Sequence, residues 1–132
     1  MEIIFADAFY FIALLNDSDE SHVHVVSLND VSRALLITTE YVLVEVADAL
    51  GQTRYRQKCA NYMRFIHSES WIEIIPAGRQ LFDVGLQLYA NRPDKRWSLT
   101  DCISFMVMWD RNLTDVLTHD HHFKQAGFRT LL

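Results

Sequence analysis

The stretch Ile3-Ile-Phe-Ala-Asp7-Ala-Phe-Tyr-Phe-Ile-Ala-Leu-Leu15 decides the fold class of this chain. Its first four residues form a short apolar run, typical of a strand that is buried on both faces. Asp7 ends the run, and apolar residues then follow at the spacing of a helix. Two interpretations of Asp7 remain open at this point. It is a helix N-cap, for which Asp is a preferred residue, or a functional carboxylate beyond a strand end, where open α/β sheets bind their ligands.

Short apolar strands alternate with helices along the rest of the chain. Further strands are predicted over 35–38, 71–76, 116–118 and 128–132, and helices over 21–34, 40–50, 53–68, 79–90 and 98–111. This alternation favours right-handed crossovers and a parallel sheet. The predicted fold is therefore a three-layer α/β/α domain with a central, mostly parallel sheet of four or five strands. No linker or repeat divides the 132 residues, so residues 1–132 are expected to form a single domain.

Composition excludes several classes of protein. Half of the residues are hydrophobic, which argues against a disordered chain, and the formal net charge of −5 argues against nucleic-acid binding by bulk positive charge. No apolar run is long enough for a membrane span. The only cysteines, Cys59 and Cys102, suggest no disulfide framework, so a reducing cytoplasm is the expected location.

Glu45 lies on an otherwise apolar helix face. It follows Val42 by three positions and precedes Ala49 by four, which places it along the apolar stripe of the helix 40–50. It is either an edge residue whose long side chain reaches solvent or an acid that points into a pocket. The helix pattern alone leaves both interpretations open.

Two further acids, Asp101 and Asp120, also lie at the ends of predicted buried elements. Asp101 is three residues after Ser98, as in a capping box, yet the helix that it opens is apolar nearly all round and should be buried. Asp120 follows the strand 116–118 within two residues, and this repeats the arrangement at Asp7. Because the carboxyl ends of central parallel strands share one crevice, we expect Asp7, Glu45, Asp101 and Asp120 to converge there.

Converging carboxylates repel one another unless their pKa values rise or a cation lies among them. An all-oxygen ligand set suits Mg²⁺ or Mn²⁺. Such an ion polarises a water and neutralises charge on phosphate oxygens, which fits hydrolysis of a phosphodiester. An alternative is a transition-metal site made of Asp120 with His119 and His122. We expect His122 instead to pack near the acid pocket or to contact phosphate.

The motifs resemble a known family. Phe5-Ala-Asp7, Thr38-Thr-Glu-Tyr-Val-Leu-Val-Glu45, Ser98-Leu-Thr-Asp101 and Leu117-Thr-His-Asp120 are together similar to PIN domains, and specifically to the VapC-type toxins of bacterial toxin–antitoxin pairs. The resemblance covers essentially the whole chain. It implies a Mg²⁺- or Mn²⁺-dependent ribonuclease in which Asp7, Glu45 and Asp101 match the core acids, Asp120 a more variable fourth acid, and Thr118 a hydroxyl residue bordering the pocket. Ala8 departs from the pattern, since many relatives carry Thr or Ser there.

The resemblance also implies partners, namely RNA, a small antitoxin and a second copy of the chain in a homodimer. Two groups of cations are candidates for phosphate contacts, and ordinary solvated surface is their alternative. They are Arg54, Arg56, Lys58 and Arg64 in the predicted helix 53–68, and Arg92, Lys95 and Arg96 before Asp101. Tyr55 and Tyr62 are expected to be exposed, where they would stack on bases or seal a dimer.

The sequence thus predicts a cytoplasmic, metal-dependent endoribonuclease without a covalent nucleophile. Asp7, Glu45, Asp101 and Asp120 are the predicted catalytic and metal-binding residues. The tentative substrate-binding residues are Thr118, His122, Arg54, Arg56 and Arg96. Two alternatives remain: a stand-alone RNA-processing nuclease with the same fold, and a non-catalytic interaction module that keeps the fold but only binds a partner.

Overall fold

The strand Ile3–Ala6, β1, lies at the centre of a five-stranded parallel sheet in the order β3-β2-β1-β4-β5. The computed structural model describes residues 2–31 and 33–132. The other strands are β2 (Leu35–Thr39), β3 (Ile72–Ile75), β4 (Asp115–Leu117) and β5 (Arg129–Thr130). The helices are α1 (Ala8–Leu15), α2 (His22–Val31), α3 (Glu40–Leu50), α4 (Arg56–Ile66), α5 (Arg79–Asn91), α6 (Leu99–Asp110) and α7 (His121–Gln125). The predicted three-layer, parallel architecture is confirmed.

The central position of β1 explains its composition. Phe5 lies between Ile37 of β2 and Val116 of β4 in the sheet register, and its side chain is completely buried. Strands with helices on both faces have no solvent-facing side, so they read as apolar runs. Beyond Ala6 the chain passes straight into α1, and the Asp7 N–H still donates to the Leu117 carbonyl at 3.4 Å. Asp7 is thereby placed at the carboxyl end of the sheet, between β1 and β4.

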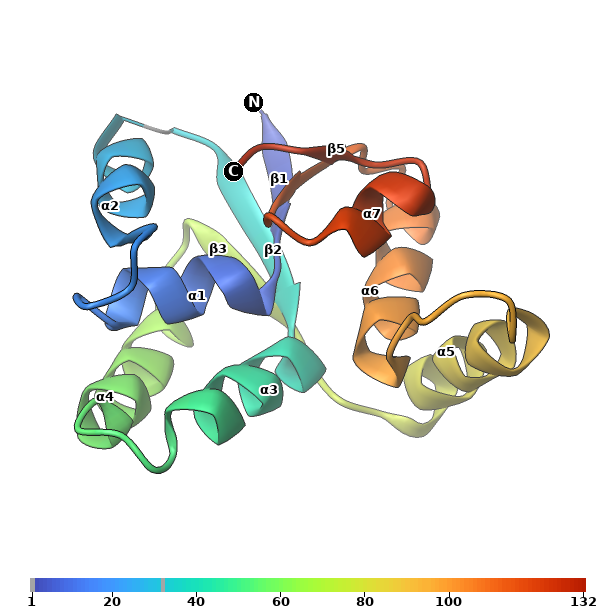
Figure 1. Cartoon of the computed structure of the whole chain (residues 1–132), viewed down its shortest axis with the longest axis horizontal. Coiled ribbons are helices and arrows are strands. Elements are labelled where there is room, and N and C mark those ends of the chain that lie inside the picture. The colour runs from blue at the N-terminus through green and yellow to red at the C-terminus, as the bar shows by residue number, and fades with distance from the viewer. Residues whose placement is uncertain (1, 32) are drawn as a thin grey trace.

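The helices cover both sides of the sheet. In Figure 1, α1, α2 and α4 lie on one side, and α5, α6 and α7 lie on the other. Helix α3 crosses between the two groups and contacts α1, α4 and α6. None of the helices in the described part of the chain is long and apolar enough to cross a membrane.

Helix α3 begins and ends where the sequence predicts. Thr39 is its N-cap, and the Thr39 Oγ1 accepts a hydrogen bond of 3.1 Å from the Val42 N–H. Other boundaries differ. Helix α2 ends at Val31, whereas the prediction ran through residue 32, which lies outside the described residues, to Ala34, which is not helical. Helix α4 begins at Arg56 instead of Thr53, because residues 50–56 form turns closed by hydrogen bonds from Thr53 and Arg56 N–H groups.

Gly85 makes the close packing of α5 on α6 possible. A Cβ added there would lie 2.2 Å from the Ile103 Cγ1 and 3.1 Å from the Ile103 Cα. The second contact is to backbone, so a rotamer change of Ile103 cannot relieve it, and the helices must separate.

Gly85→Ala is therefore expected to destabilise the protein by about 1–3 kcal/mol, the usual cost of overpacking a core. Gly78→Ala is the matched control, because no atom lies within 4 Å of a Cβ there and φ is an ordinary −173°. Urea unfolding of both variants measures the difference. Equal stability of Gly85→Ala and the parent chain would contradict the packing described here.

Candidate active site: carboxylates at the end of the sheet

Asp7 is buried at the carboxyl end of β1, with 6% of its surface exposed. It occupies the N-cap position of α1, but its side chain makes no capping hydrogen bond. Its Oδ2 instead accepts a 2.9 Å hydrogen bond from the Thr118 hydroxyl. Removal from water, with smaller contributions from the charges of Asp101 and Glu45, raises the pKa of Asp7 to about 7. Asp7 is thus the N-cap residue of α1 by position, while its buried carboxylate bonds to Thr118 instead of making the usual capping bond.

Thr118 connects two of the predicted acids. Its hydroxyl donates to Asp7 and accepts a 3.2 Å hydrogen bond from the backbone N–H of Asp120. The side chain is completely buried. The sequence placed Thr118 at the border of the pocket; the structure adds that it holds the ends of β1 and β4 together through Asp7.

Asp101 opens α6 and is 7% exposed. Its Oδ2 accepts a 3.3 Å hydrogen bond from the Ser98 N–H, and the Ser98 hydroxyl accepts one of 3.0 Å from the Asp101 N–H. The reciprocal hydrogen bonds of a capping box are thus present, and they use only one of the two carboxylate oxygens of Asp101. Burial and the charge of Asp120 raise the pKa of Asp101, while Ser98 and His122 act in the opposite direction. Both interpretations of Asp101 therefore apply at the same time: the residue caps α6 and also lies close enough to Asp120 to feel its charge.

Glu45 projects from the middle of α3 and is exposed. Partial removal from water, with the charges of Asp101 and Asp120, raises the pKa of Glu45. Its neighbours Val42 and Val46 are buried, whereas Ala49 is exposed. Glu45 therefore lies at the edge of the apolar stripe, on the side that faces the other acids.

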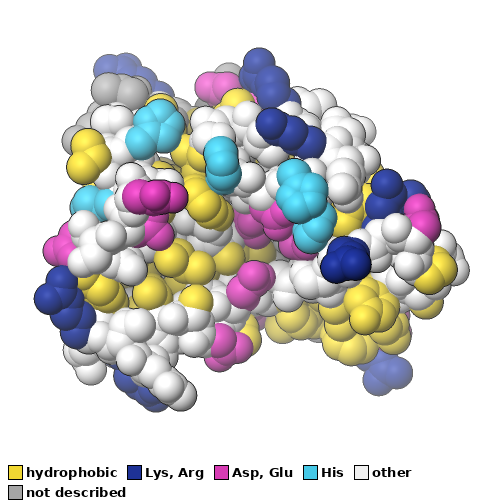
Figure 2. Space-filling view, viewed as in Figure 1, with side chains coloured by type: hydrophobic (Ala, Val, Ile, Leu, Met, Phe, Trp, Pro, Cys, Tyr) yellow, Lys and Arg dark blue, Asp and Glu magenta, His cyan; other side chains and the backbone are white. Residues whose placement is uncertain are grey.

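Asp120 and His122 complete the site. The Asp120 Oδ1 caps α7 by accepting a 2.9 Å hydrogen bond from the His122 N–H. The His122 Nδ1 lies 3.3 Å from the Asp101 Oδ2 and 3.4 Å from the Asp120 Oδ1. Figure 2 shows Asp and Glu side chains gathered near the middle of this face with His side chains beside them, while Lys and Arg lie mainly at its edges.

His119 and His121 face differently from what the sequence suggested. The His119 Nδ1 lies 3.1 Å from the Leu132 carbonyl, and its ring packs on Phe9. His121, not His119, accompanies Asp120 and His122, and the three possible ligand atoms lie within 4.8 Å of one another. The predicted alternative site of Asp120, His119 and His122 is therefore wrong about His119, whose place His121 takes. Adjacency in sequence was the signal that would have pointed to His121.

The first group of predicted cations lies apart from the acids. Arg54 lies 3.5 Å from the Asp17 Oδ1 and contacts the Tyr55 hydroxyl, and the Arg56 Nη1 donates to the Gly51 carbonyl. Arg54 lies in the turn before α4 and Arg56 is its first residue, and Figure 1 places α4 on the opposite side of the molecule from α6 and α7. The structure thus does not bring Arg54 and Arg56 together with the acids.

Tyr55 and Tyr62 are not the exposed aromatics that the sequence predicted. Tyr55 is 9% exposed, and its hydroxyl donates a 2.6 Å hydrogen bond to Asp17. Tyr62 packs against the core with a buried hydroxyl. Both rings pack against the core, so the predicted exposure of these two tyrosines is wrong.

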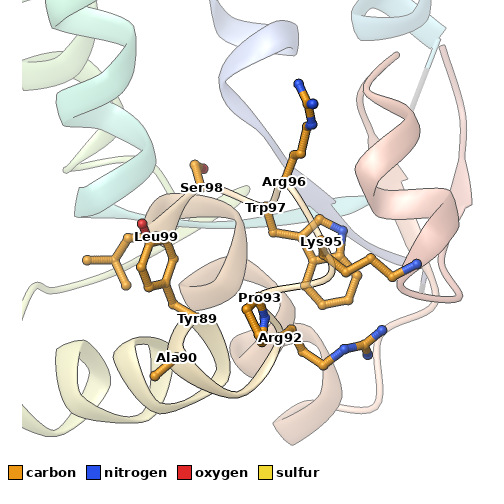
Figure 3. Close-up of a pocket in the computed structure, with 9 residues that line it drawn as sticks. All are labelled: Tyr89, Ala90, Arg92, Pro93, Lys95, Arg96, Trp97, Ser98 and Leu99. Atoms are coloured by element: carbon orange, nitrogen blue, oxygen red, sulfur yellow. The ribbon is translucent and has the colours of Figure 1, made fainter.

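The second group of cations borders a pocket beside Asp101. The pocket has a volume of about 830 Å³ and lies between the end of α5 and the start of α6 (Figure 3). Arg92 is held by two hydrogen bonds to Asp94. Lys95 and Arg96 form no ion pair with any residue that the structure describes. Ser98, which bonds to Asp101, lines the same pocket as these two cations.

Comparison of the structure with solved proteins shows the fold. VapC20 of Mycobacterium tuberculosis, a sarcin–ricin loop cleaving toxin, aligns with a TM-score of 0.85 and 21% identity over 96% of both chains. FitAcB of Neisseria gonorrhoeae aligns with a TM-score of 0.67 and 16% identity over 98% of this chain and 96% of that one. VapBC2 of Rickettsia felis, solved with promoter DNA, gives 0.66 and 13% over 98% and 97%.

No protein-family model and no curated protein matches the sequence. The likeness is therefore one of structure. The chain has the PIN-like fold of the VapC-type toxins, and the resemblance that the motifs predict is confirmed at the level of the fold.

Proposed function

We propose that this protein is a Mg²⁺- or Mn²⁺-dependent endoribonuclease and the toxin of a toxin–antitoxin pair. One observation carries the proposal. Asp7, Glu45 and Asp101 come from three separate elements, yet burial raises the pKa of each of them, and neighbouring acids add to the effect. Asp101 acts on both Asp7 and Glu45, and Asp120 acts on both Glu45 and Asp101. A fold gains no stability from such repulsion, and strongly perturbed acids in one place favour a functional site.

The residues fit a hard divalent cation. Asp7, Glu45, Asp101 and Asp120 offer only oxygen ligands, the type that Mg²⁺ and Mn²⁺ prefer. Among the described residues, only Asp120, His121 and His122 bring three possible ligand atoms within 4.8 Å of one another. Mg²⁺ keeps several waters and uses one or two protein carboxylates, so the four acids need not be in mutual contact to hold it. When bound, such an ion supplies an activated water and neutralises charge on the phosphate.

The side chains have distinct roles in this proposal. Asp7 and Asp101, which are buried and held by Thr118 and Ser98, provide fixed carboxylates for the cation. Glu45 and Asp120 face the same space from less buried positions. His122 lies beside Asp101 and Asp120 with 20% of its side chain exposed, where it can donate to a phosphate oxygen. No side chain acts as a covalent nucleophile, so the reaction is direct hydrolysis.

RNA is the substrate that the surroundings favour. Lys95, Arg96 and Tyr89 line a pocket that also includes Ser98, the capping partner of Asp101, so phosphates and a stacked base would find partners there. Arg54 and Arg56 remain candidates only for an RNA that extends across the molecule to α4. The overall negative charge means that such an RNA is held locally and not by the whole surface.

A small antitoxin and a second copy of the chain are the proposed protein partners. Similar chains were solved as VapBC complexes. An Arg of an antitoxin placed among the carboxylates would neutralise their charge and compete with the cation. A cytoplasmic location fits, because both cysteines are free and buried.

Controlled expression followed by sequencing of RNA ends tests the proposed function. New ends should accumulate at a few defined sites with the native chain and not with Asp101→Asn. Ends that accumulate equally with both chains would contradict a nuclease and support the non-catalytic module. Growth arrest that a co-expressed neighbouring reading frame relieves would separate a toxin from a stand-alone processing enzyme.

Thr118 is proposed to position Asp7, and its hydroxyl can be removed at nearly constant volume. We expect Thr118→Val to raise the Mg²⁺ concentration for half-maximal cleavage by roughly 10–100-fold, as loss of a residue that orients a metal ligand usually does. Thr118→Ser keeps the hydroxyl and should behave like the parent chain. Equal Mg²⁺ dependence of the Val and Ser variants would show that the hydrogen bond to Asp7 is not needed.

A further inference from the structure

Asp120, His121 and His122 bring three possible metal ligands together at the edge of the carboxylate cluster. The Asp120 Oδ1 lies 3.7 Å from the His121 Nδ1 and 3.4 Å from the His122 Nδ1. All three ligand atoms lie within 4.8 Å of one another, and no other set of His, Cys, Asp and Glu among residues 2–31 and 33–132 does so.

The spacing is close to that of a tetrahedral site. Zinc lies about 2.0–2.2 Å from nitrogen and oxygen ligands, which separates neighbouring ligands by about 3.3–3.6 Å in a tetrahedron. The distances of 3.4 and 3.7 Å from Asp120 already approach this value. The Asp120 Oδ1 is also fixed by the His122 N–H at 2.9 Å. The third separation, between the two imidazoles, is at most 4.8 Å, so the site closes around one ion when these rings turn towards each other.

The ligand types distinguish this site from the all-oxygen set of carboxylates, with which it shares only Asp120. Two imidazole nitrogens and one carboxylate suit Zn²⁺ and its transition-metal neighbours, whereas Mg²⁺ prefers oxygen. Zn²⁺ also binds nitrogen and oxygen sites more tightly than Mn²⁺ does. With three protein ligands, a water completes the tetrahedron.

We propose that Asp120, His121 and His122 form a transition-metal site that takes Zn²⁺, and that Zn²⁺ bound there lowers the nuclease activity. Zn²⁺ at this site engages Asp120, one of the acids assigned to the nuclease reaction. It also engages His122, whose Nδ1 lies 3.3 Å from the Asp101 Oδ2. Both groups are thereby withdrawn from the carboxylate cluster. The inhibitory effect rests on the proposed nuclease function, whereas the binding of Zn²⁺ does not.

His121 allows the site to be removed without touching the carboxylate cluster. Its side chain is 72% exposed, and it has no role in the proposed reaction. His119→Ala is the matched control, because His119 lies two residues away and faces the Leu132 carbonyl instead.

Calorimetric titration of Zn²⁺ into the untagged, EDTA-stripped chain in excess Mg²⁺ tests the binding. The parent chain and His119→Ala should bind one Zn²⁺ with equal affinity, and His121→Ala should bind it at least about tenfold more weakly, equivalent to about 1.4 kcal/mol. Equal affinity of His121→Ala and the parent chain, or no Zn²⁺ binding at all, would overturn the site whatever the enzymatic activity.

Cleavage assays in Mg²⁺ with increasing Zn²⁺ test the inhibition. Zn²⁺ should inhibit the parent chain at lower concentrations than it inhibits His121→Ala. Identical inhibition of both would place the inhibitory Zn²⁺ among the carboxylates and overturn the regulatory part. A chain that binds Zn²⁺ through His121 but cleaves no RNA would contradict the proposed function and leave the metal site standing.

Discussion

Replacement of Asp101 by Asn is expected to abolish RNA cleavage while the domain stays folded. Asn has nearly the same shape, and its amide oxygen can still accept the hydrogen bond from the Ser98 N–H that helps to cap α6. The negative charge is lost, however, and with it one of the two buried carboxylates that would hold the cation. We expect cleavage to fall by at least about 100-fold, the range seen when one group that stabilises developing charge is removed.

Asp110→Asn is the matched control for this substitution. Asp110 is the last residue of the same helix and is exposed, far along α6 from the acids. It should retain parental activity. Circular dichroism and urea unfolding of both variants establish that they are folded. Full activity of a folded Asp101→Asn variant would remove Asp101 from the reaction and, with it, the proposed site.

The stability of the metal-free protein is expected to fall as the pH rises from about 4 to about 7. The pKa of Asp7 is about 7 in the folded chain, against an ordinary value of 3.8. Between these values the folded protein binds a proton that the unfolded chain does not bind, so raising the pH favours unfolding. Above about pH 7 the cost is complete. A difference of about three pKa units corresponds to about 4 kcal/mol, which is the upper bound for this effect.

Asp7→Asn should remove most of that pH dependence. An Asn carries no charge into the buried position, and its amide oxygen can still accept the hydrogen bond from Thr118. Urea unfolding in EDTA at pH 5 and pH 8 measures the effect: the parent chain should lose stability between the two values, and Asp7→Asn should lose much less. Asp48→Asn, an exposed acid on α3, is the control and should follow the parent chain.

Millimolar Mg²⁺ should restore stability to the parent chain at pH 8 and not to Asp7→Asn, because the cation compensates the charges of the buried acids. The same pH dependence in the parent chain and Asp7→Asn would show that Asp7 is not held as an uncompensated acid. A loss of stability in Asp7→Asn at pH 8 would contradict the physical account of this position.

The apolar runs were sufficient to predict the architecture. The run before Asp7 is apolar because β1 has sheet neighbours on both edges and helices on both faces. This apolar pattern does not depend on how individual side chains pack. The start and end of α3 could likewise be predicted from local residues, Thr39 as its N-cap and Gly51 after its last turn. Boundaries set by turns, such as the start of α4, depend on hydrogen bonds between residues that no periodicity reveals.

The candidate acids could be found because acids on buried elements are unusual, but their surroundings could not. Whether Asp7 caps a helix or faces a pocket depends on the Thr118 hydroxyl, which is 111 residues away in sequence. His119 faces the Leu132 carbonyl, whereas His121 is exposed to solvent beside Asp120. No sequence pattern distinguishes these two orientations. The burial of Tyr55 cannot be predicted locally, because Asp17, which accepts its hydroxyl hydrogen bond, is 38 positions away in sequence.

Cleavage of a short RNA by the purified, untagged chain in ¹⁸O-labelled water tests the central claim most directly. The account predicts cleavage that Mg²⁺ or Mn²⁺ supports and EDTA stops, with one ¹⁸O in the single terminal phosphate that each cleavage leaves, a hydroxyl on the other new end, and no 2′,3′-cyclic phosphate. Cleavage that persists in EDTA and leaves a 2′,3′-cyclic phosphate would contradict it, because the 2′-hydroxyl of the RNA would then be the nucleophile and the carboxylates would have no cation to hold.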